Sequence, residues 1–145
     1  MNSKEPDARI RIDKMLIEAG WKLPGWSKDE EINVKTEIKN DFGEADYVLL
    51  SSKENHLCTV EAKKNTLSPL VGKEQARDYA DALKSRFVIL SNGIYHYLWD
   101  LKQGNPFRVE KFPSQEELEM RMDTFNPPRD ENEKDGINDD YLALT

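Results

Sequence analysis

Hydrophobic residues follow two kinds of spacing along the chain, and the spacing predicts where helices and strands lie. Between residues 7 and 19, apolar side chains recur every three or four positions, as in an amphipathic helix, and Gly20 provides a C-terminal stop. From Ile32 to Ile38, apolar and polar residues alternate, as in a strand with one buried face. The chain is therefore expected to begin with a helix followed by a strand.

Two short apolar runs come next, and polar turn residues bound each of them. The runs are Tyr47–Leu50 and Leu57–Ala62, joined by the polar residues 51–55. Runs of this length between turns indicate strands, and a short connection favours antiparallel pairing. Together with the strand before them, they predict an antiparallel meander of three strands.

The second half of the chain predicts helices and strands in mixed order. A continuous apolar run is typical of a strand covered on both faces, and Asn92-Gly93 is typical of a tight hairpin turn. The expected elements are a helix at 68–84, a strand at 87–90, a strand at 95–99, a short strand at 108–112 and a polar helix at 114–123. This order predicts the α/β class, with a mixed β-sheet flanked by helices.

Composition narrows the class of protein. Of the 145 residues, 34% are charged and 37% are hydrophobic, so one domain can fold around its own core without disulfides. The mean hydropathy is -0.80. No apolar run is long enough to cross a bilayer, and the N-terminus lacks the hydrophobic segment of a secretory signal. We therefore expect a cytoplasmic protein with no membrane partner.

Charge is unevenly distributed. The net charge is -7, and residues 126–145 carry six acidic against two basic side chains, which leaves -3 for residues 1–125. We expect residues 1–125 to form the folded domain and residues 126–145 to form an acidic linker or tail. A chain of this charge is not expected to hold nucleic acid by a broad electrostatic attraction of its own.

Three charged residues lie at the ends of otherwise apolar strands. Asp46 opens the first run, and Glu61 and Lys63 end the second. Residues two apart on a strand project from the same face, so Glu61 and Lys63 point the same way. If the strands are neighbours, the two carboxylates can share one Mg²⁺ ion, because hard cations prefer oxygen ligands. Lys63 can then orient a water molecule or stabilise charge on a phosphate.

A second polar pair lies on the helix that follows. Gln75 and Tyr79 are four residues apart, so they share one helical face and can position a phosphate or a metal-bound water. Taken singly, these residues also have structural explanations: Asp46 can cap a turn, and Glu61 with Lys63 can form a solvated cross-strand ion pair. The five together favour a site.

The ordered set of motifs resembles a known family. Asp46, with fourteen residues between it and Glu61-Ala62-Lys63, resembles the PD-(D/E)xK nuclease signature, and residues 75–79 resemble the QxxxY motif of a subset of these nucleases. Over residues 5–113 the chain is similar to the N-terminal nuclease domain of the restriction (R) subunit of type I restriction-modification enzymes. The segments that carry this similarity are EAGW, GEADYVLL, TVEAKK, EQARDYADAL, SNG and YLWD. An ExK tripeptide alone is a weak signal, whereas the ordered set is specific.

The resemblance implies a fold, an activity and a cofactor. The fold is a restriction-endonuclease-like mixed sheet, and the activity is magnesium-dependent hydrolysis of phosphodiester bonds in double-stranded DNA. In that family the aspartate and the glutamate hold the metal and the lysine serves the water, roles that map onto Asp46, Glu61 and Lys63. The main-chain carbonyl of Ala62 would be a further metal ligand.

Further residues take roles through the same resemblance. Gln75 and Tyr79 take the QxxxY roles in catalysis, and Glu5 is a weaker candidate for the acidic metal ligand that these nucleases often carry on the first helix. In the PD-(D/E)xK signature a proline precedes the aspartate, and this chain has Ala45 at that position.

The resemblance also implies partners. In type I enzymes the nuclease domain is fused to an ATP-driven DNA translocase and works with methylation and specificity subunits, so the choice of DNA sequence lies outside this domain. The chain has no GxxxxGK[ST] phosphate loop, and we expect it to be part of a longer subunit whose translocase binds ATP. Two alternatives stay open: a stand-alone PD-(D/E)xK nuclease of repair or phage type, and a non-catalytic binding module with the same fold.

Overall fold

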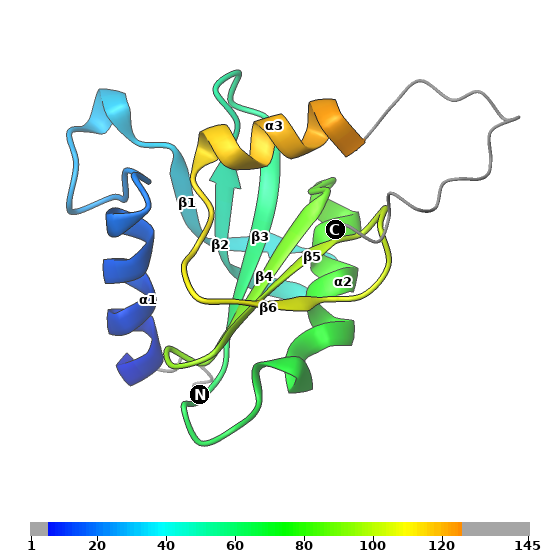
Figure 1. Ribbon diagram of the computed structural model, residues 1–145. Helices are drawn as coiled ribbons and strands as arrows, with labels where there is room; N and C mark the ends of the chain where they lie inside the picture. The colour runs from blue at the N-terminus through cyan, green and yellow to red at the C-terminus, as the bar shows by residue number, and fades with distance from the viewer. Residues whose placement is uncertain (1–5, 126–145) are drawn as a thin grey trace, which may run out of the picture.

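The computed structural model describes residues 6–125, which form a six-stranded sheet with helices on both faces (Figure 1). The predicted α/β class, with a mixed sheet flanked by helices, is confirmed. The elements in chain order are α1 (Pro6–Glu18), η1 (Asp29–Glu31), β1 (Val34–Asn40), β2 (Gly43–Leu50), β3 (His56–Ala62), η2 (Pro69–Gly72), α2 (Lys73–Leu83), β4 (Phe87–Ser91), β5 (His96–Asp100), β6 (Phe107–Val109) and α3 (Gln115–Phe125).

Strand order in the sheet follows the order in the chain. β1, β2 and β3 form the expected antiparallel meander. β3 and β4 are parallel, and the connection between them passes through η2 and α2, as parallel neighbours require. β5 and β6 then return antiparallel. β3 is therefore an interior strand with neighbours on both sides.

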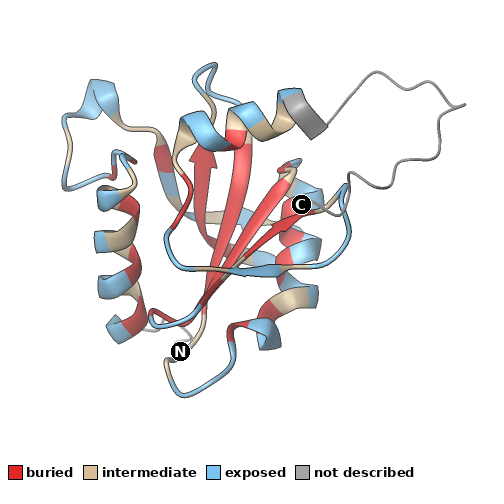
Figure 2. Cartoon of the chain, in the orientation of Figure 1, coloured by how far each residue is buried: buried red, intermediate tan, exposed pale blue. Residues whose placement is uncertain are grey.

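The two faces of the sheet bury separate clusters. Along β4, Phe87 and Ile89 belong to the cluster that includes α1 and α3, whereas Val88 and Leu90 pack with α2. This arrangement explains why β4 reads as a continuous apolar run, because alternate side chains are covered by different helices. Figure 2 shows the central strands as the most fully buried part of the molecule.

Two elements differ from the prediction. The helix expected from residue 68 begins as the 3₁₀ turn η2, in which Ser68 Oγ accepts a hydrogen bond from Leu70 N at 3.1 Å. At Gly72 the backbone leaves helical geometry (φ -92°, ψ 12°), so α2 starts only at Lys73. The strand expected over 108–112 is limited to β6, because the chain leaves the sheet and Phe112 packs edge-on against His96 in the core.

Of the helices between residues 6 and 125, none is both long and apolar enough to cross a membrane. The linker predicted over residues 126–145 and the candidate ligand Glu5 lie outside the residues that the structure describes.

Candidate active site

The β2–β3 hairpin places Asp46 beside Glu61. Tyr47 pairs with Val60 in the antiparallel register, so the residue before Tyr47 and the residue after Val60, Asp46 and Glu61, lie opposite each other. The N–H of Asp46 donates to Glu61 Oε2 at 3.2 Å, and the N–H of Ala62 donates to Asp46 Oδ2 at 2.8 Å. Each carboxylate is thus fixed by a main-chain donor on the neighbouring strand. Both residues are largely buried, with exposed fractions of 9% for Asp46 and 4% for Glu61.

The two carboxylates make an electrostatically costly pair. Burial raises the pKa of Glu61 above its ordinary value, and the charge of Asp46 raises it further, while Lys63 acts in the opposite direction. Two acidic groups held together away from water repel each other when both are ionised. A bound cation would remove that repulsion, so the pair has the donor chemistry and the charge that fit a magnesium ion.

Lys63 follows directly after β3. Its N–H donates to the carbonyl of Ser91 at 2.9 Å, which continues the parallel pairing one residue past the strand. The aliphatic part of its half-buried side chain lies against Gly72, so close that a Cβ atom on Gly72 would be 2.6 Å from Lys63 Cε. The end of η2 therefore packs against the side chain of Lys63, whose charge acts on Glu61.

Of the two predicted helical residues, α2 brings Tyr79 to the site. Tyr79 is 4% exposed, and the charges of Glu61 and Asp46 act on its phenol, whose pKa is raised first by burial and then by these carboxylates. The hydroxyl of Tyr79 lies against Gly43: a Cβ atom added to Gly43 would be only 2.7 Å from that hydroxyl. Gln75 is one turn earlier in α2 and is exposed. The structure thus brings Asp46, Glu61, Lys63 and Tyr79 together and leaves Gln75 at the surface.

Arg9 of α1 is a site residue that the sequence did not reveal. Its Nη1 lies 3.5 Å from Asp46 Oδ1, and its Nε donates to the hydroxyl of Tyr47 at 2.9 Å. The same guanidinium pairs with Glu37 at 3.0 Å, and Tyr47 in turn donates to Asp13 at 2.6 Å. α1 therefore supplies a cation that partly balances the acidic pair. The only local signal is that residues 9 and 13 share a helical face; the contact with Asp46 depends on tertiary packing.

The metal site predicted from the sequence has two acidic side chains. Among residues 6–125, no group of three or more His, Cys, Asp or Glu side chains is arranged to hold a metal ion. This is compatible with Mg²⁺, which is commonly held by one or two carboxylates while water and phosphate oxygens complete its shell. The carbonyl of Ala62 stays a predicted ligand.

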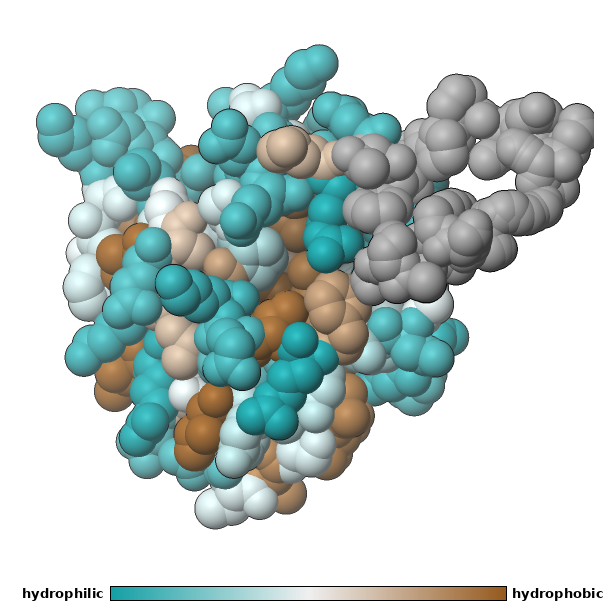
Figure 3. Space-filling view, in the orientation of Figure 1, coloured by the Kyte–Doolittle hydropathy of each residue, from teal (hydrophilic) through white to brown (hydrophobic). Residues whose placement is uncertain are grey.

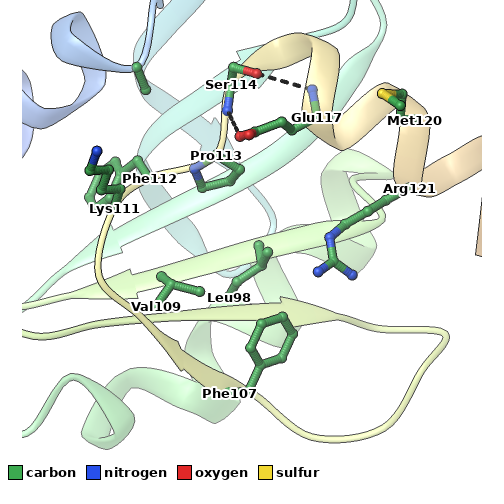
Figure 4. A pocket seen from close by; sticks show the side chains of 11 residues that line it. Leu98, Phe107, Val109, Lys111, Phe112, Pro113, Ser114, Glu117, Met120 and Arg121 are labelled. Atoms are coloured by element: carbon green, nitrogen blue, oxygen red, sulfur yellow. Dashed lines mark hydrogen bonds between the residues drawn. The ribbon is translucent and has the colours of Figure 1, made fainter. Parts of the chain in front are cut away.

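A groove with none of these residues in its lining lies elsewhere on the molecule. It has a volume of about 700 Å³ and opens between α3 and the strands β5 and β6. Figure 4 shows Phe107 and Met120 beside it, and the reciprocal hydrogen bonds of Ser114 and Glu117 that begin α3. In the space-filling view, hydrophobic surface lies in the middle of this face (Figure 3). None of the five candidate catalytic residues lines the groove, so we do not assign the chemistry to it.

The family model described as type I restriction enzyme R protein N terminus matches residues 9–113. Among solved structures, a fragment assigned to the HsdR subunit of a type I restriction enzyme from Vibrio vulnificus YJ016 is similar with a TM-score of 0.71 and 24% identity. The similarity covers 91% of this chain and 28% of that one, so this chain spans less than a third of its relative.

A second solved structure is more distant. The type IIG restriction endonuclease BpuSI is similar with a TM-score of 0.44 and 18% identity, over 81% of this chain and 15% of that one. No curated protein sequence gives a significant match.

Proposed function

The chain belongs to the family of type I restriction enzyme R protein N termini, and from that premise we propose that it is a magnesium-dependent endonuclease domain acting on double-stranded DNA. The observation that carries the proposal is the buried pair of Asp46 and Glu61 with Lys63 beside it. Buried like charges next to a lysine are costly for folding and useful for binding a metal ion and a phosphate.

Each residue has a distinct role in the proposed reaction. Asp46 and Glu61, with the carbonyl of Ala62, would hold Mg²⁺, which when bound activates water and neutralises charge on the phosphate. Water attacks the phosphorus atom and loses a proton to solvent, the bond from phosphorus to one sugar oxygen breaks, and that oxygen leaves and takes up a proton from solvent. The ammonium group of Lys63 orients the water or stabilises the charge that develops on the phosphate oxygens.

Tyr79 and Gln75 would act from α2. The raised pKa of Tyr79 keeps its phenol protonated, so it can donate a hydrogen bond to a phosphate oxygen or a water molecule. Gln75 is exposed on the same helix. In the proposed role, its side-chain amide donates a hydrogen bond to a phosphate of DNA bound at the surface.

The partners follow from the family. We propose that the domain works within a restriction-modification complex, together with methylation and specificity subunits, and that ATP is used by a translocase part of the R subunit. Membership of the family supports this. Because the domain is acidic, delivery by a translocase would raise its effective concentration at DNA without strong binding of its own.

The test is cleavage by the complete complex carrying Asp46→Ala, Glu61→Ala or Lys63→Ala. We expect each variant to lose about 10³-fold or more in cleavage rate, with ATP hydrolysis unchanged, because each removes a group needed at the reacting phosphate. Asp81→Asn, which changes an exposed carboxylate on α2, is the matched control and should cleave like the parent. Retained cleavage in all three site variants would overturn the assignment. A parent complex that binds DNA but never cuts it would favour a non-catalytic module.

A further inference from the structure

Gly72 lies at the junction of η2 and α2, directly against Lys63. A Cβ atom on Gly72 would be 2.6 Å from Cε of Lys63, 3.6 Å from its Nζ and 3.7 Å from its Cδ. The first of these distances is shorter than nonbonded carbon atoms tolerate. The space that any other side chain would need is thus already occupied by the end of Lys63.

The backbone at this position does not itself demand glycine. Gly72 has φ -92° and ψ 12°, a combination that ordinary residues also adopt. Gly104 is the opposite case, because its φ of 118° favours glycine while nothing lies within 4 Å of where its Cβ would be. At position 104 the backbone conformation favours glycine, whereas at position 72 glycine leaves room for the side chain of Lys63.

We propose that Gly72 is a positioning residue for Lys63. Its missing side chain forms a slot that holds Cε of Lys63 against the junction of η2 and α2. Because the pairing of β3 with β4 continues to Lys63, its side chain projects from the same face as Glu61, and the slot limits where the ammonium group on that face can lie. The role rests on the proposed function, in which Lys63 serves the water or the phosphate.

A second contact at the site has the same form. Gly43 lies against the hydroxyl of Tyr79, where a Cβ atom would be 2.7 Å away. Two of the candidate catalytic side chains are therefore seated on glycines from different elements. Because the φ of Gly43 is 140°, its substitution would also strain the backbone, so Gly72 is the cleaner position to test.

If the slot positions Lys63, Gly72→Ala should fold normally and cleave DNA slowly. In Gly72→Ala, the added methyl group pushes the end of a flexible, half-exposed side chain, which can swing towards solvent at little cost in folding free energy. We expect the melting temperature to stay close to that of the parent. In the complete complex, kcat for cleavage should fall about 10–100-fold with KM unchanged, since a displacement of about 1 Å at a reacting group can cost that much.

Gly104→Ala is the matched control with the reverse expectation. It forces an ordinary residue into left-handed backbone geometry in the loop after β5, which holds none of the candidate catalytic residues, so it should lower the free energy of unfolding by about 1 kcal/mol. Cleavage by the folded protein should be unchanged.

The position of Lys63 gives a readout that needs no cleavage. A crystal structure of the Gly72→Ala chain, or NMR of lysine labelled with ¹³C at Cε, should find the end of Lys63 displaced from its place in the parent. If Gly72→Ala lowers stability after all, the double variant with Lys63→Ala decides the reason. A loss that disappears without Lys63 supports the slot, and a loss that persists overturns it.

The outcomes separate this proposal from the proposed function. Unchanged cleavage in Lys63→Ala would refute the role of Lys63 in catalysis and with it the catalytic meaning of the slot. Lost cleavage in Lys63→Ala with parental cleavage and an unmoved Lys63 in Gly72→Ala would refute the slot alone.

Discussion

Two buried pairs of charged residues lie towards opposite ends of β4, and they are built on opposite principles. At one end, Arg86 donates to Asp100 through Nε and Nη2, both at 2.9 Å, and the two side chains are 8% and 2% exposed. Near the other end, Glu61 pairs with Leu90 in the sheet and lies against Asp46, a group of the same charge.

The difference separates a structural pair from a candidate functional one. The arginine and the aspartate carry opposite charges and compensate each other's charge within the fold. The two carboxylates are compensated only in part, by Arg9 and Lys63. A fold that keeps repelling charges buried gives up stability there, and such sites are commonly the ones that bind or react.

The largest expected effect tests the compensated pair. Asp100→Asn leaves the guanidinium of Arg86 buried without its carboxylate partner, so we expect the free energy of unfolding to fall by about 3–5 kcal/mol. Urea denaturation followed by circular dichroism measures it. The double variant Arg86→Met with Asp100→Leu should recover most of the loss, because it removes both charges. A loss below about 1 kcal/mol in Asp100→Asn would contradict the comparison.

A smaller effect of opposite sign is expected at the acidic pair. Glu61→Gln keeps an oxygen to accept the N–H of Asp46 and removes the repulsion, so the metal-free chain should gain about 1 kcal/mol at pH 8. Cleavage should be lost at the same time. Glu30→Gln, at an exposed position, is the control and should change neither property.

The pH dependence of Glu61→Gln follows from the direction of the pKa shift. In the unfolded chain Glu61 has its ordinary pKa of 4.5, and in the folded chain its pKa is higher. At a pH between the unfolded-state and the folded-state pKa, the folded chain therefore binds more protons than the unfolded chain. Stability contributed by this group therefore falls as the pH rises through that window. The gain from Glu61→Gln should be larger at pH 8 than at pH 5, and equal gains at both would contradict the repulsion.

A third effect, similar in size to the second, concerns the partial compensation by Arg9. Arg9→Met removes the cation next to Asp46 and a hydrogen bond to Tyr47, and we expect a loss of about 1 kcal/mol in unfolding free energy. Glu37→Gln changes the more exposed partner of the same arginine and should cost less than about 0.5 kcal/mol. If Glu37→Gln is the more damaging of the two, Arg9 does not act through Asp46.

What the sequence could predict was local. Asp46 and Glu61 stand on a hairpin whose strands and turn are all visible in one stretch, so their proximity follows from pairing rules and needs no knowledge of the rest of the fold. The α/β class and the crossover between β3 and β4 also follow from patterns within single segments.

What it could not predict depends on how separate segments pack. The contact of Arg9 with Asp46 is set by the rotation and position of α1 on the sheet, and the pairing of Arg86 with Asp100 by the register of β4 and β5. Ser68-Pro69 predicted the start of an α-helix, but the residues that follow form the 3₁₀ turn η2. The four-residue spacing between Gln75 and Tyr79 did not predict that Gln75 is exposed. The assignment of the site residues to catalysis remains a proposal.

The helical crossover has a consequence for the order of folding. The two carboxylates meet through a hairpin with a short turn, and such contacts close within microseconds. The contact of Lys63 with Gly72 and the parallel pairing of β3 with β4 form only after the segment between them has ordered. Closing a longer loop costs more chain entropy, so contacts between residues distant in sequence form later. We therefore expect the nascent chain to assemble its acidic half-site first and to gain the lysine only when the centre of the sheet is complete.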